Sequence, residues 1–242
     1  MRLLSYNIHK GIGGRDRRYR LSRILEVIRR EEADLLCLQE VARGSPRSYY
    51  DDQPKLLAEL TQSTAHLFQL NVHWQEGGYG NLLLSRWPIG EHHQIPLTFD
   101  GKKPRGGQIA TVETPEGPLL LLNWHLGLSE KERDWQVRHL LAHRLFQESA
   151  HLPALIAGDF NDWRNALVPD PMLKAGFQQV TSPPSHFRSF PAYLAMGSLD
   201  KAFFRGAVLI RQAHIVHSRL TRDASDHLPL VIDFHLKRPA AS

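Results

Sequence analysis

The sequence predicts an α/β protein in which helices pack on the outside of β-sheet structure. Short apolar runs with the composition of β-strands alternate along the chain with segments whose apolar residues recur at helical spacing. Hydrophobic residues make up 42% of the 242 residues, which is enough to fill a sizeable core. Charged residues make up 23%, close to the average of globular proteins. The periodicity leaves open whether the strands form one sheet or two stacked sheets.

The first elements are predicted to be a strand, a helix and a second strand. Apolar runs at residues 3–8 and 34–38 have the length of buried strands. Between them, apolar residues recur at helical spacing, at Leu21, Ile24, Leu25 and Ile28. This order of elements predicts two parallel strands joined by a right-handed crossover.

The middle of the chain is predicted to contain a helix followed by three strands. The helix is expected at residues 55–60, and the strands at 81–84, 108–112 and 119–124. Residues 114–118, Thr-Pro-Glu-Gly-Pro, separate the last two strands and have the composition of a hairpin turn.

The clearest predicted helix begins after Ser129. The segment Ser129-Glu-Lys-Glu132 has the form of a capping box, in which the serine oxygen and the Glu132 carboxylate each accept a hydrogen bond from a backbone N–H. Its apolar side is expected to contain Trp135, Leu140, Leu141 and Leu145, and its solvated side Arg133, Arg138 and Arg144.

The last part of the chain is predicted to be richer in strands and loops. Strands are expected at residues 154–157, 198–204, 208–217 and 230–235. A loop-rich region between the first two of these is marked by Pro169, Pro171, Pro183, Pro184 and Pro191. No internal repeat or linker is apparent, so we expect one domain over residues 1–236, with residues 237–242 as a frayed tail.

Composition excludes several classes of protein. The single cysteine, Cys37, excludes an intramolecular disulfide, and its apolar neighbours favour a buried side chain over a nucleophile. The first ten residues contain no signal-peptide core, and no apolar run approaches the length of a transmembrane segment. We therefore expect a soluble, cytoplasmic protein that acts as a monomer.

Positive charge is in excess and is unevenly distributed. The formal net charge is +5 and the isoelectric point is about 9.5, which suits a polyanionic or phosphate-bearing partner without proving one. Arginines crowd one stretch, at Arg15, Arg17, Arg18, Arg20 and Arg23, with Asp16 as its only carboxylate. This stretch is either a solvated basic face or a loop that contacts phosphate, and in the second case Arg15 is a candidate substrate-binding residue.

Polar residues stand repeatedly at the ends of the apolar strands. They are Asn7, Glu40, His125, Asp159, Asn161, Asp226 and His227. Because parallel strands deliver such residues to one edge of a sheet, where α/β sheets bind ligands, we expect these side chains to meet. Carboxylates, amides and imidazoles in this combination suit Mg²⁺ and a phosphate group.

The motifs that carry these residues resemble those of a known superfamily. They occur in the order Ser5-Tyr-Asn7, Leu38-Gln-Glu40, Asn123-Trp-His-Leu126, Ala157-Gly-Asp-Phe-Asn161 and Ser225-Asp-His-Leu-Pro229. This ordered set resembles the endonuclease/exonuclease/phosphatase superfamily of deoxyribonuclease-I-like phosphoesterases. The segment from Gly80 to Ile89 resembles another part of that family and adds Asn81 as a candidate substrate-binding residue. The resemblance implies a four-layer α/β sandwich of two mixed β-sheets packed face to face, with helices outside, and metal-dependent hydrolysis of phosphoesters.

The resemblance also implies roles for individual residues. Glu40 would be the principal ligand of Mg²⁺, or of Mn²⁺ in its place, with Asn7 and Asp226 close to the metal. Asp200 would hold His227 and fix its tautomer. The segment around Asp200 departs from the family pattern, because Lys201 stands where an aromatic residue is usual, and this puts the local packing in doubt.

The remaining implied roles concern the attacking water and the phosphate. Asp159, with Asn161 beside it, would position the water, and His125 would donate to a phosphoryl oxygen. Whether Asp159 or His227 accepts the proton of the water stays open, as does the use of one metal or two. His9 and Lys10 follow Asn7 and could face the cleft, but they are not included in the catalytic set.

Two functions are consistent with these residues. The first is a metal-dependent hydrolase of a phosphoester substrate, with nucleic acid, a phospholipid headgroup and a small phosphate ester all open as substrate. The second is a phosphate- or nucleic-acid-binding protein that kept the fold without catalysis. The complete set of candidate residues favours the hydrolase, because a binding protein does not need groups that activate water.

Overall fold

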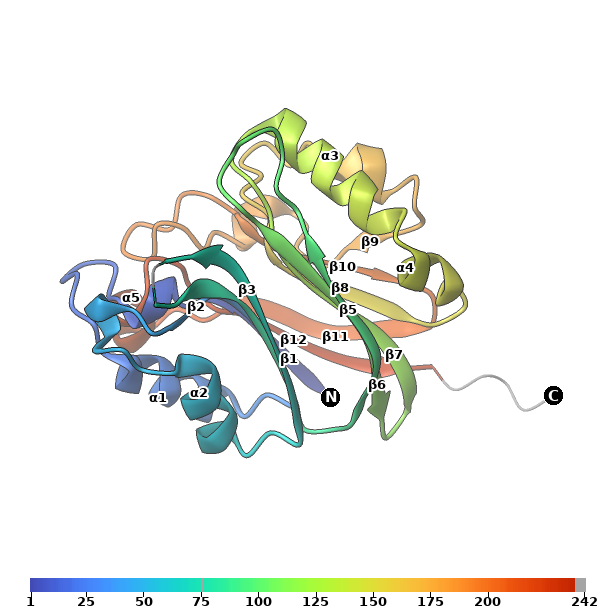
Figure 1. The fold of residues 1–242 in the computed structure, drawn as a ribbon. Helices are drawn as coiled ribbons and strands as arrows, with labels where there is room; N and C mark the ends of the chain where they lie inside the picture. The colour runs from blue at the N-terminus through green and yellow to red at the C-terminus, as the bar shows by residue number, and fades with distance from the viewer. Residues whose placement is uncertain (75, 238–242) are drawn as a thin grey trace.

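The computed structural model describes residues 1–74 and 76–237, which form two six-stranded sheets packed face to face (Figure 1). In the first sheet the order is β11-β12-β1-β2-β4-β3, with β1 (Arg2–Asn7), β2 (Leu35–Arg43), β3 (Ala65–His73), β4 (Gly78–Ser85), β11 (Val208–Ile215) and β12 (Leu230–Leu236). In the second the order is β5-β6-β7-β8-β10-β9, with β5 (Ile89–Pro96), β6 (Gly106–Thr114), β7 (Gly117–His125), β8 (Ala154–Asp159), β9 (Gln178–Gln179) and β10 (Asp200–Arg205). Both sheets are mixed: β1–β2 and β7–β8 are parallel pairs, and the other pairs are antiparallel.

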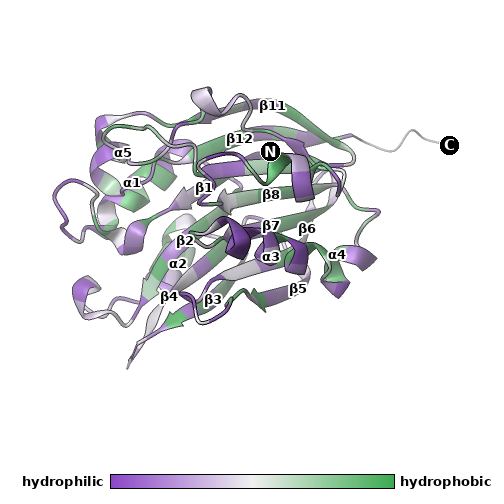
Figure 2. Cartoon of the chain, turned by 90° about the horizontal axis from the view of Figure 1, so that it is seen from above, coloured by the Kyte–Doolittle hydropathy of each residue, from purple (hydrophilic) through white to green (hydrophobic). Residues whose placement is uncertain are grey.

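Helices cover the outer face of each sheet. The first sheet is covered by α1 (Leu21–Glu31), α2 (Gln53–Thr61) and α5 (Arg219–Ala224), and the second by α3 (Glu130–Leu141) and α4 (Arg144–Glu148) (Figure 1). Figure 2 shows apolar residues gathered along the strands, and hydrophilic residues along α3 and the loops. This confirms the four-layer α/β sandwich that the sequence motifs implied.

Each central strand contributes to two hydrophobic cores. Leu3 and Leu35 point into the core between the sheets, whereas Leu4 and Leu36 point into the core beneath α1 and α2. Successive side chains of a strand face opposite sides of the sheet, so a strand between two cores is apolar at nearly every position. This is why the predicted strands appeared as continuous apolar runs.

The structure contains elements that the sequence did not predict. Strands β3, β5 and β9 and helix α5 were not predicted, and the helix predicted after Ser129 is divided into α3 and α4. The predicted strand at residues 34–38 continues to Arg43. The continuation passes through an irregularity between Leu38 and Val41, where Glu40 has a left-handed φ of 54°. Of the predicted tail, residues 238–242 lie outside the described part of the chain.

Helix α3 begins with the predicted capping box, and each of its two predicted faces contains one misplaced residue. The Ser129 side chain accepts from the N–H of Glu132, and the Glu132 side chain accepts from the N–H of Ser129. Arg133, expected in solvent, is buried and donates to the carbonyl of Leu128 at 2.7 Å. Trp135, expected in the core, is 37% exposed and stacks on the ring of His139. In the described residues, no helix is long and apolar enough to cross a membrane.

Candidate active site

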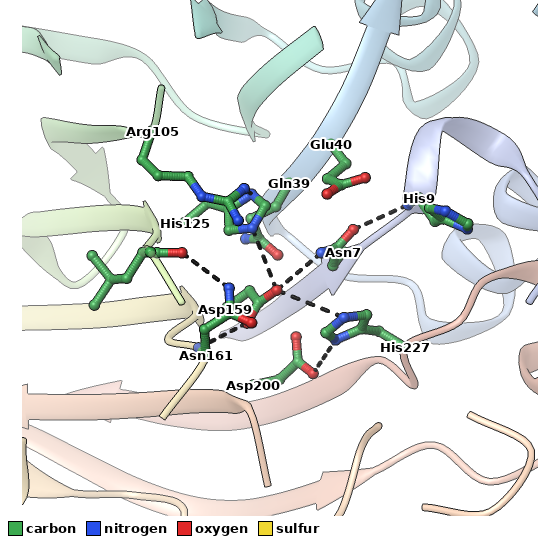
Figure 3. A network of polar contacts seen from close by, with 12 residues as sticks. Asn7, His9, Gln39, Glu40, Arg105, His125, Asp159, Asn161, Asp200 and His227 are labelled. Atoms are coloured by element: carbon green, nitrogen blue, oxygen red, sulfur yellow. Dashed lines mark hydrogen bonds and ion pairs between the residues drawn. The ribbon is translucent and has the colours of Figure 1, made fainter. Parts of the chain in front are cut away.

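Polar side chains from both sheets meet where β1, β7 and β8 end (Figure 3). In the second sheet, His125 is paired with Asp159 across the parallel strands β7 and β8, and Asp159 is paired with Asp200 across the antiparallel strands β8 and β10. The three residues therefore occupy one row across the sheet. From the first sheet, Asn7 reaches this row at the end of β1. The expected meeting at parallel strand ends is therefore only part of the arrangement, because Asp200 comes from the start of an antiparallel strand.

The carboxylate of Asp159 lies at the centre of these contacts (Figure 3). Its Oδ2 accepts a hydrogen bond from Asn7 Nδ2 at 3.0 Å, and lies 3.5 Å from His125 Nε2 and 3.6 Å from His227 Nε2. Its Oδ1 accepts from the backbone N–H of Asn161 at 3.0 Å. One buried carboxylate thus faces an amide and two imidazoles at the same time.

Local backbone conformation sets the position of Asp159. A Cβ at the preceding residue, Gly158, would lie 2.0 Å from the carbonyl oxygen of Trp124 in β7, so only glycine allows the two strands to approach this closely. After the strand, Asn161 takes a left-handed φ of 49°, and its side chain donates to the carbonyl of Leu126 at 2.9 Å. The chain therefore turns away immediately after delivering the carboxylate.

His227 is held by a second buried carboxylate. Its Nδ1 contacts Asp200 Oδ2 at 2.8 Å, and Asp200 is fully buried. Burial by itself would lower the pKa of His227, but the charges of Asp200 and Asp159 outweigh it and raise the pKa to about 10. The imidazole is therefore positively charged at neutral pH, with Nδ1–H directed to Asp200 and Nε2–H toward Asp159.

Asp159 and His125 are shifted toward their neutral forms. Burial raises the pKa of Asp159 to about 6; repulsion from Asp200 adds to this, and attraction to His227 opposes it. Burial lowers the pKa of His125 well below 6.5, and the positive charge of Arg105 acts in the same direction. Arg105 Nη1 lies 3.4 Å from His125 Nδ1. An imidazole that accepts at Nδ1 carries its proton on Nε2, the nitrogen that faces Asp159.

Glu40 lies beside this centre in a strained conformation. Its left-handed backbone interrupts the pairing of β2 with β4, and its carboxylate contacts the ammonium of Lys10. Burial would raise the pKa of Glu40, but the positive charge of Lys10 outweighs burial and holds that pKa well below its usual range. The carboxylate is therefore ionised.

The segment before β12 supplies a further carboxylate. Asp226 Oδ1 lies 3.6 Å from His9 Nδ1, and the neighbouring hydroxyl of Ser225 donates to the carbonyl of Asn7 at 2.7 Å. This bond ties the segment that carries Asp226 and His227 to the end of β1. The backbone N–H of His9 in turn donates to Asn7 Oδ1 at 3.1 Å.

The donor chemistry here fits a hard divalent cation with few protein ligands. Glu40 and Asp226 offer carboxylate oxygens, and Glu40 already contacts one cation, the Lys10 ammonium. Within residues 1–74 and 76–237, no group of three or more His, Cys, Asp or Glu side chains is arranged to hold a metal ion. Mg²⁺ keeps several waters and needs only one or two carboxylates from the protein, so such a group is not required for it.

Comparisons with known proteins agree with this geometry. The sequence matches the Endonuclease/Exonuclease/phosphatase family over residues 4–227. The chain belongs to this family. It is 30% identical over 247 residues to the uncharacterized protein YbhP of Escherichia coli K12, a match covering 97% of this chain and 96% of YbhP. Membership supports phosphoester hydrolysis as the class of activity.

Solved structures of the family share the fold. The endonuclease/exonuclease/phosphatase from Beutenbergia cavernae superimposes with a TM-score of 0.84 at 25% identity, covering all of this chain and 73% of that one. The catalytic domain of human Nocturnin gives a TM-score of 0.72 at 22% identity, with 98% and 93% covered. TDP2 of D. rerio, in complex with a single-strand DNA product, gives 0.73 at 19% identity, with 97% and 98% covered.

Two residues predicted to bind substrate lie away from the Asp159 carboxylate. Asn81 is fully buried in β4, where its Nδ2 donates to the carbonyl of Gly106 at 2.8 Å. Gly106 is paired with His125, so Asn81 supports the strand next to the centre. Arg15 is exposed and lines a separate surface pocket of about 420 Å³ together with Arg23, Arg219, Asp16 and Asp223.

Sequence reasoning missed the amides that join the two sheets behind the site. Gln39 Nε2 donates to Asn123 Oδ1 at 2.8 Å, and Asn123 Nδ2 donates to Gln108 Oε1 at 2.9 Å. Both residues lie inside family motifs quoted above: Gln39 directly precedes Glu40, and Asn123 stands two residues before His125. The sequence therefore contained a signal that could have identified them. Arg105 was also missed, whereas Lys10, which was expected only as a residue that could face the cleft, contacts Glu40.

Lys201, the departure from the family pattern, is buried beneath the site. Its side chain is 1% exposed, and Nζ donates to the carbonyl of Ser198 at 2.7 Å. Burial lowers its pKa to about 8, and the nearby carboxylates of Asp162 and Asp200 oppose this shift. The lysine therefore packs into the place of an aromatic residue by bonding to its own loop, and Asp200 keeps its contact with His227.

Proposed function

We propose that this protein is a divalent-metal-dependent phosphoesterase that hydrolyses a phosphodiester by attack of water. The observation that carries the proposal is the buried Asp159 carboxylate, which faces His125 and His227 while Asp200 supports His227. A carboxylate with a pKa of about 6 can accept a proton, and the charged and the neutral imidazole beside it can stabilise negative charge.

Asp159 is the general base in this proposal. With a pKa of about 6 it is mainly ionised at neutral pH, yet basic enough to take a proton from water. His227 does not fit this role, because an imidazole with a pKa raised to about 10 already carries its proton. Its charge instead stabilises the phosphoryl oxygens as negative charge accumulates, and Asp200 fixes its orientation.

His125 and Asn161 complete the polar lining. His125 is neutral and presents Nε2–H on the side of Asp159, where it can donate to a phosphoryl oxygen. Asn161 holds the Asp159 carboxylate through its backbone N–H and fixes the turn that follows the strand. Asn7 donates to the other carboxylate oxygen, so that both oxygens of Asp159 are restrained.

Mg²⁺ or Mn²⁺ would be held by Glu40, with Asn7 and Asp226 close by. When bound, the ion supplies positive charge that polarises a phosphoryl oxygen of the substrate. Lys10 must leave the Glu40 carboxylate for this to occur, and its ammonium then becomes available to the substrate. Because one chain supplies every residue named here, we also propose that the protein acts as a monomer, in the cytoplasm.

A phosphodiester of nucleic-acid type is the substrate class that we propose. The net charge of +5 suits a polyanion, and the structurally similar D. rerio TDP2 was solved with a single-strand DNA product. The full set of ionisable groups around Asp159 argues against a protein that only binds phosphate, since binding does not require a buried base and its paired imidazole.

The test is hydrolysis of bis-p-nitrophenyl phosphate with Mg²⁺, with Mn²⁺ and with EDTA. We expect turnover with either metal and none with EDTA, and we expect Glu40→Gln to shift the Mg²⁺ titration to higher concentration because one ligand charge is lost. Lys55→Met, a change in the exposed face of α2, is the control and should leave the titration unchanged. Binding of phosphate compounds without metal-dependent turnover would overturn the proposal.

A further inference from the structure

A cluster of positive side chains lies beside the proposed centre, on the side of His125. Lys10 and Lys103 both approach the ring of Tyr79, with their Nζ atoms 4.8 and 5.3 Å from its centroid. Arg105 follows in the same segment before β6 and contacts His125 (Figure 3). Tyr79 is 5% exposed, and its ring contacts both Lys10, which follows β1, and Lys103, which lies in the segment between β5 and β6.

The positive charge in this cluster exceeds the negative charge. Glu40 is the carboxylate partner of Lys10, whereas Lys103 and Arg105 form no ion pair with any carboxylate of residues 1–74 and 76–237. Arg105 is only 6% exposed. Removing a guanidinium from water without an anionic partner is unfavourable, and a planar guanidinium binds a phosphate group through two parallel hydrogen bonds. The cluster is therefore suited to an anion.

The anion that this cluster takes is not the phosphate group under attack. His125 Nδ1 faces Arg105 Nη1 at 3.4 Å, whereas the other ring nitrogen, Nε2, points in a different direction and lies 3.5 Å from Asp159 Oδ2. The imidazole ring therefore stands between the guanidinium and the carboxylate proposed as base. A phosphorus atom attacked by water at Asp159 lies on the far side of this ring from Arg105.

We propose that Arg105 and Lys103 form a subsite for a second phosphate group of the same substrate molecule. The inference rests on the proposed function, since it places this group next to the phosphoester that is hydrolysed. The second group is either the next phosphodiester of a nucleic-acid strand or a terminal phosphomonoester of a smaller compound. Both offer the anionic oxygens that the guanidinium and the ammonium recognise.

The experiment compares two chromogenic esters that differ only in the second phosphate. One is the p-nitrophenyl ester of thymidine 5′-phosphate, and the other is the same ester with an added 3′-phosphate. A second series exchanges the two positions: the p-nitrophenyl ester of thymidine 3′-phosphate is measured without and with an added 5′-phosphate. We expect kcat/KM to be about 10–100 times higher with the second phosphate in one isomer series, the usual effect of a hydrogen bond to a charged group. Methylation converts the added phosphomonoester into a phosphodiester and so distinguishes the two kinds of second phosphate group. If the increase in kcat/KM survives methylation, the subsite takes a backbone diester; if the increase is lost, the subsite takes a phosphomonoester.

Variants assign the gain to the cluster. We expect Arg105→Met to abolish the ratio between the two esters, and Lys103→Met to reduce it about threefold, since its ammonium is exposed to solvent. Using the ratio removes any effect of Arg105→Met on His125, because both esters depend on His125 equally. Lys55→Met is the control and should keep the wild-type ratio.

A binding measurement distinguishes failure of the subsite from failure of the proposed function. The dissociation constants of thymidine 3′,5′-bisphosphate and thymidine 5′-monophosphate are compared by calorimetry, with the wild type and with Lys103→Met. Equal kcat/KM for the esters in both series, with turnover intact, overturns the subsite and leaves the proposed function standing. If no ester is hydrolysed, the proposed function fails, and the calorimetric preference for the bisphosphate, with its decrease in Lys103→Met, still decides the subsite.

Discussion

At the scale of single residues, the site contains two acids whose pKa values lie above their ordinary values for different reasons. Asp159 is raised chiefly because it is buried, whereas His227 is raised because two carboxylates outweigh its burial. The first shift makes a better base, and the second preserves a positive charge. Together they support our proposal that the carboxylate accepts the proton, a choice that the sequence alone left open between these two residues.

A pH profile tests this assignment. A base must be unprotonated, so kcat/KM should fall as the pH drops below about 6, the pKa of Asp159. A stabilising imidazolium must be protonated, so activity should fall only as the pH rises toward about 10. The measurement is kcat/KM for bis-p-nitrophenyl phosphate from pH 5 upward with the metal held constant. If activity were instead lost as the pH rises through about 6, this would contradict the raised pKa of His227 and the role that depends on its charge.

Removal of the His227 side chain tests its contribution directly. We expect His227→Ala to lower kcat by roughly 10²–10⁴, the usual range for a group that acts on charge or protons in the transition state. Asp200→Asn should lower kcat less, and should move the alkaline fall in activity to lower pH because the imidazolium loses its nearest negative charge. Far-UV circular dichroism shows whether both variants fold. Wild-type activity in folded His227→Ala would exclude the role.

The sequence anticipated many residues at this scale but not their environment. The ordered motifs singled out Asn7, Asp159 and His227, whose side chains lie together in the structure, and their roles stay predictions. Arg105 carried no signal, because its segment has the composition of a polar loop and its burial depends on distant strands. Lys201 had a signal, as a departure from the family pattern, but its bond to Ser198 could not be inferred from the chain.

At the scale of elements, register determines what the site contains. His125, Asp159 and Asp200 are paired neighbours on three adjacent strands, so a shift of one residue in any strand would turn a side chain to the opposite face. Gly158 permits this register, because it lets β8 approach the backbone of β7 at Trp124. The site therefore depends on a residue without a side chain.

Gly158→Ala tests the close approach. The added methyl group would meet the Trp124 carbonyl and the backbone would be strained at φ 156°, so we expect a loss of about 3 kcal/mol in the free energy of unfolding. Gly101→Ala is the control: its φ is 65°, but no atom lies within 4 Å of the added group, so about 1 kcal/mol is expected. Urea denaturation measures both. Equal losses would show that crowding at Trp124 is unimportant.

The two long strands that the sequence missed are edge strands with little burial. Strands β3 and β5 are the outermost strands of their sheets, and most of their side chains are partly or fully exposed. An edge strand has one partner and often a wet face, so polar residues such as His92 and Gln94 interrupt the apolar pattern on which prediction depends. Central strands were found because cores on both faces make them continuously apolar.

At the scale of the whole molecule, two sheets with separate outer cores must meet correctly to assemble one site. Periodicity gave the strands but not their division into two sheets, because a strand buried on both faces has the same pattern in either arrangement. The four-layer arrangement came from the resemblance of the motifs, and the structure confirms it. Behind the site, the sheets are joined by buried amides as well as by apolar contacts.

Asn123 is the residue through which this joining can be tested. Its Nδ2 donates to Gln108 and to the carbonyls of Leu38 and Leu82, and its Oδ1 accepts from Gln39, so one side chain of β7 bonds to two strands of the opposite sheet. Asn123→Leu keeps the number and branching of the side-chain heavy atoms and removes every one of these bonds. We expect a loss of about 3 kcal/mol in the free energy of unfolding, because the abandoned groups stay buried.

Activity should fall together with stability in this variant, since Gln39 precedes Glu40 and loses its restraint. The matched control is Gln179→Leu, which removes hydrogen bonds to Asn165 and Thr181 at the edge of the second sheet, without a link to the first. It should cost about 1 kcal/mol and leave kcat unchanged. Urea denaturation and metal-dependent turnover are measured on both variants below their unfolding transitions. If Asn123→Leu were as stable and as active as Gln179→Leu, the amides would not be what aligns the two sheets, and the apolar core would suffice to place Glu40 opposite Asp159.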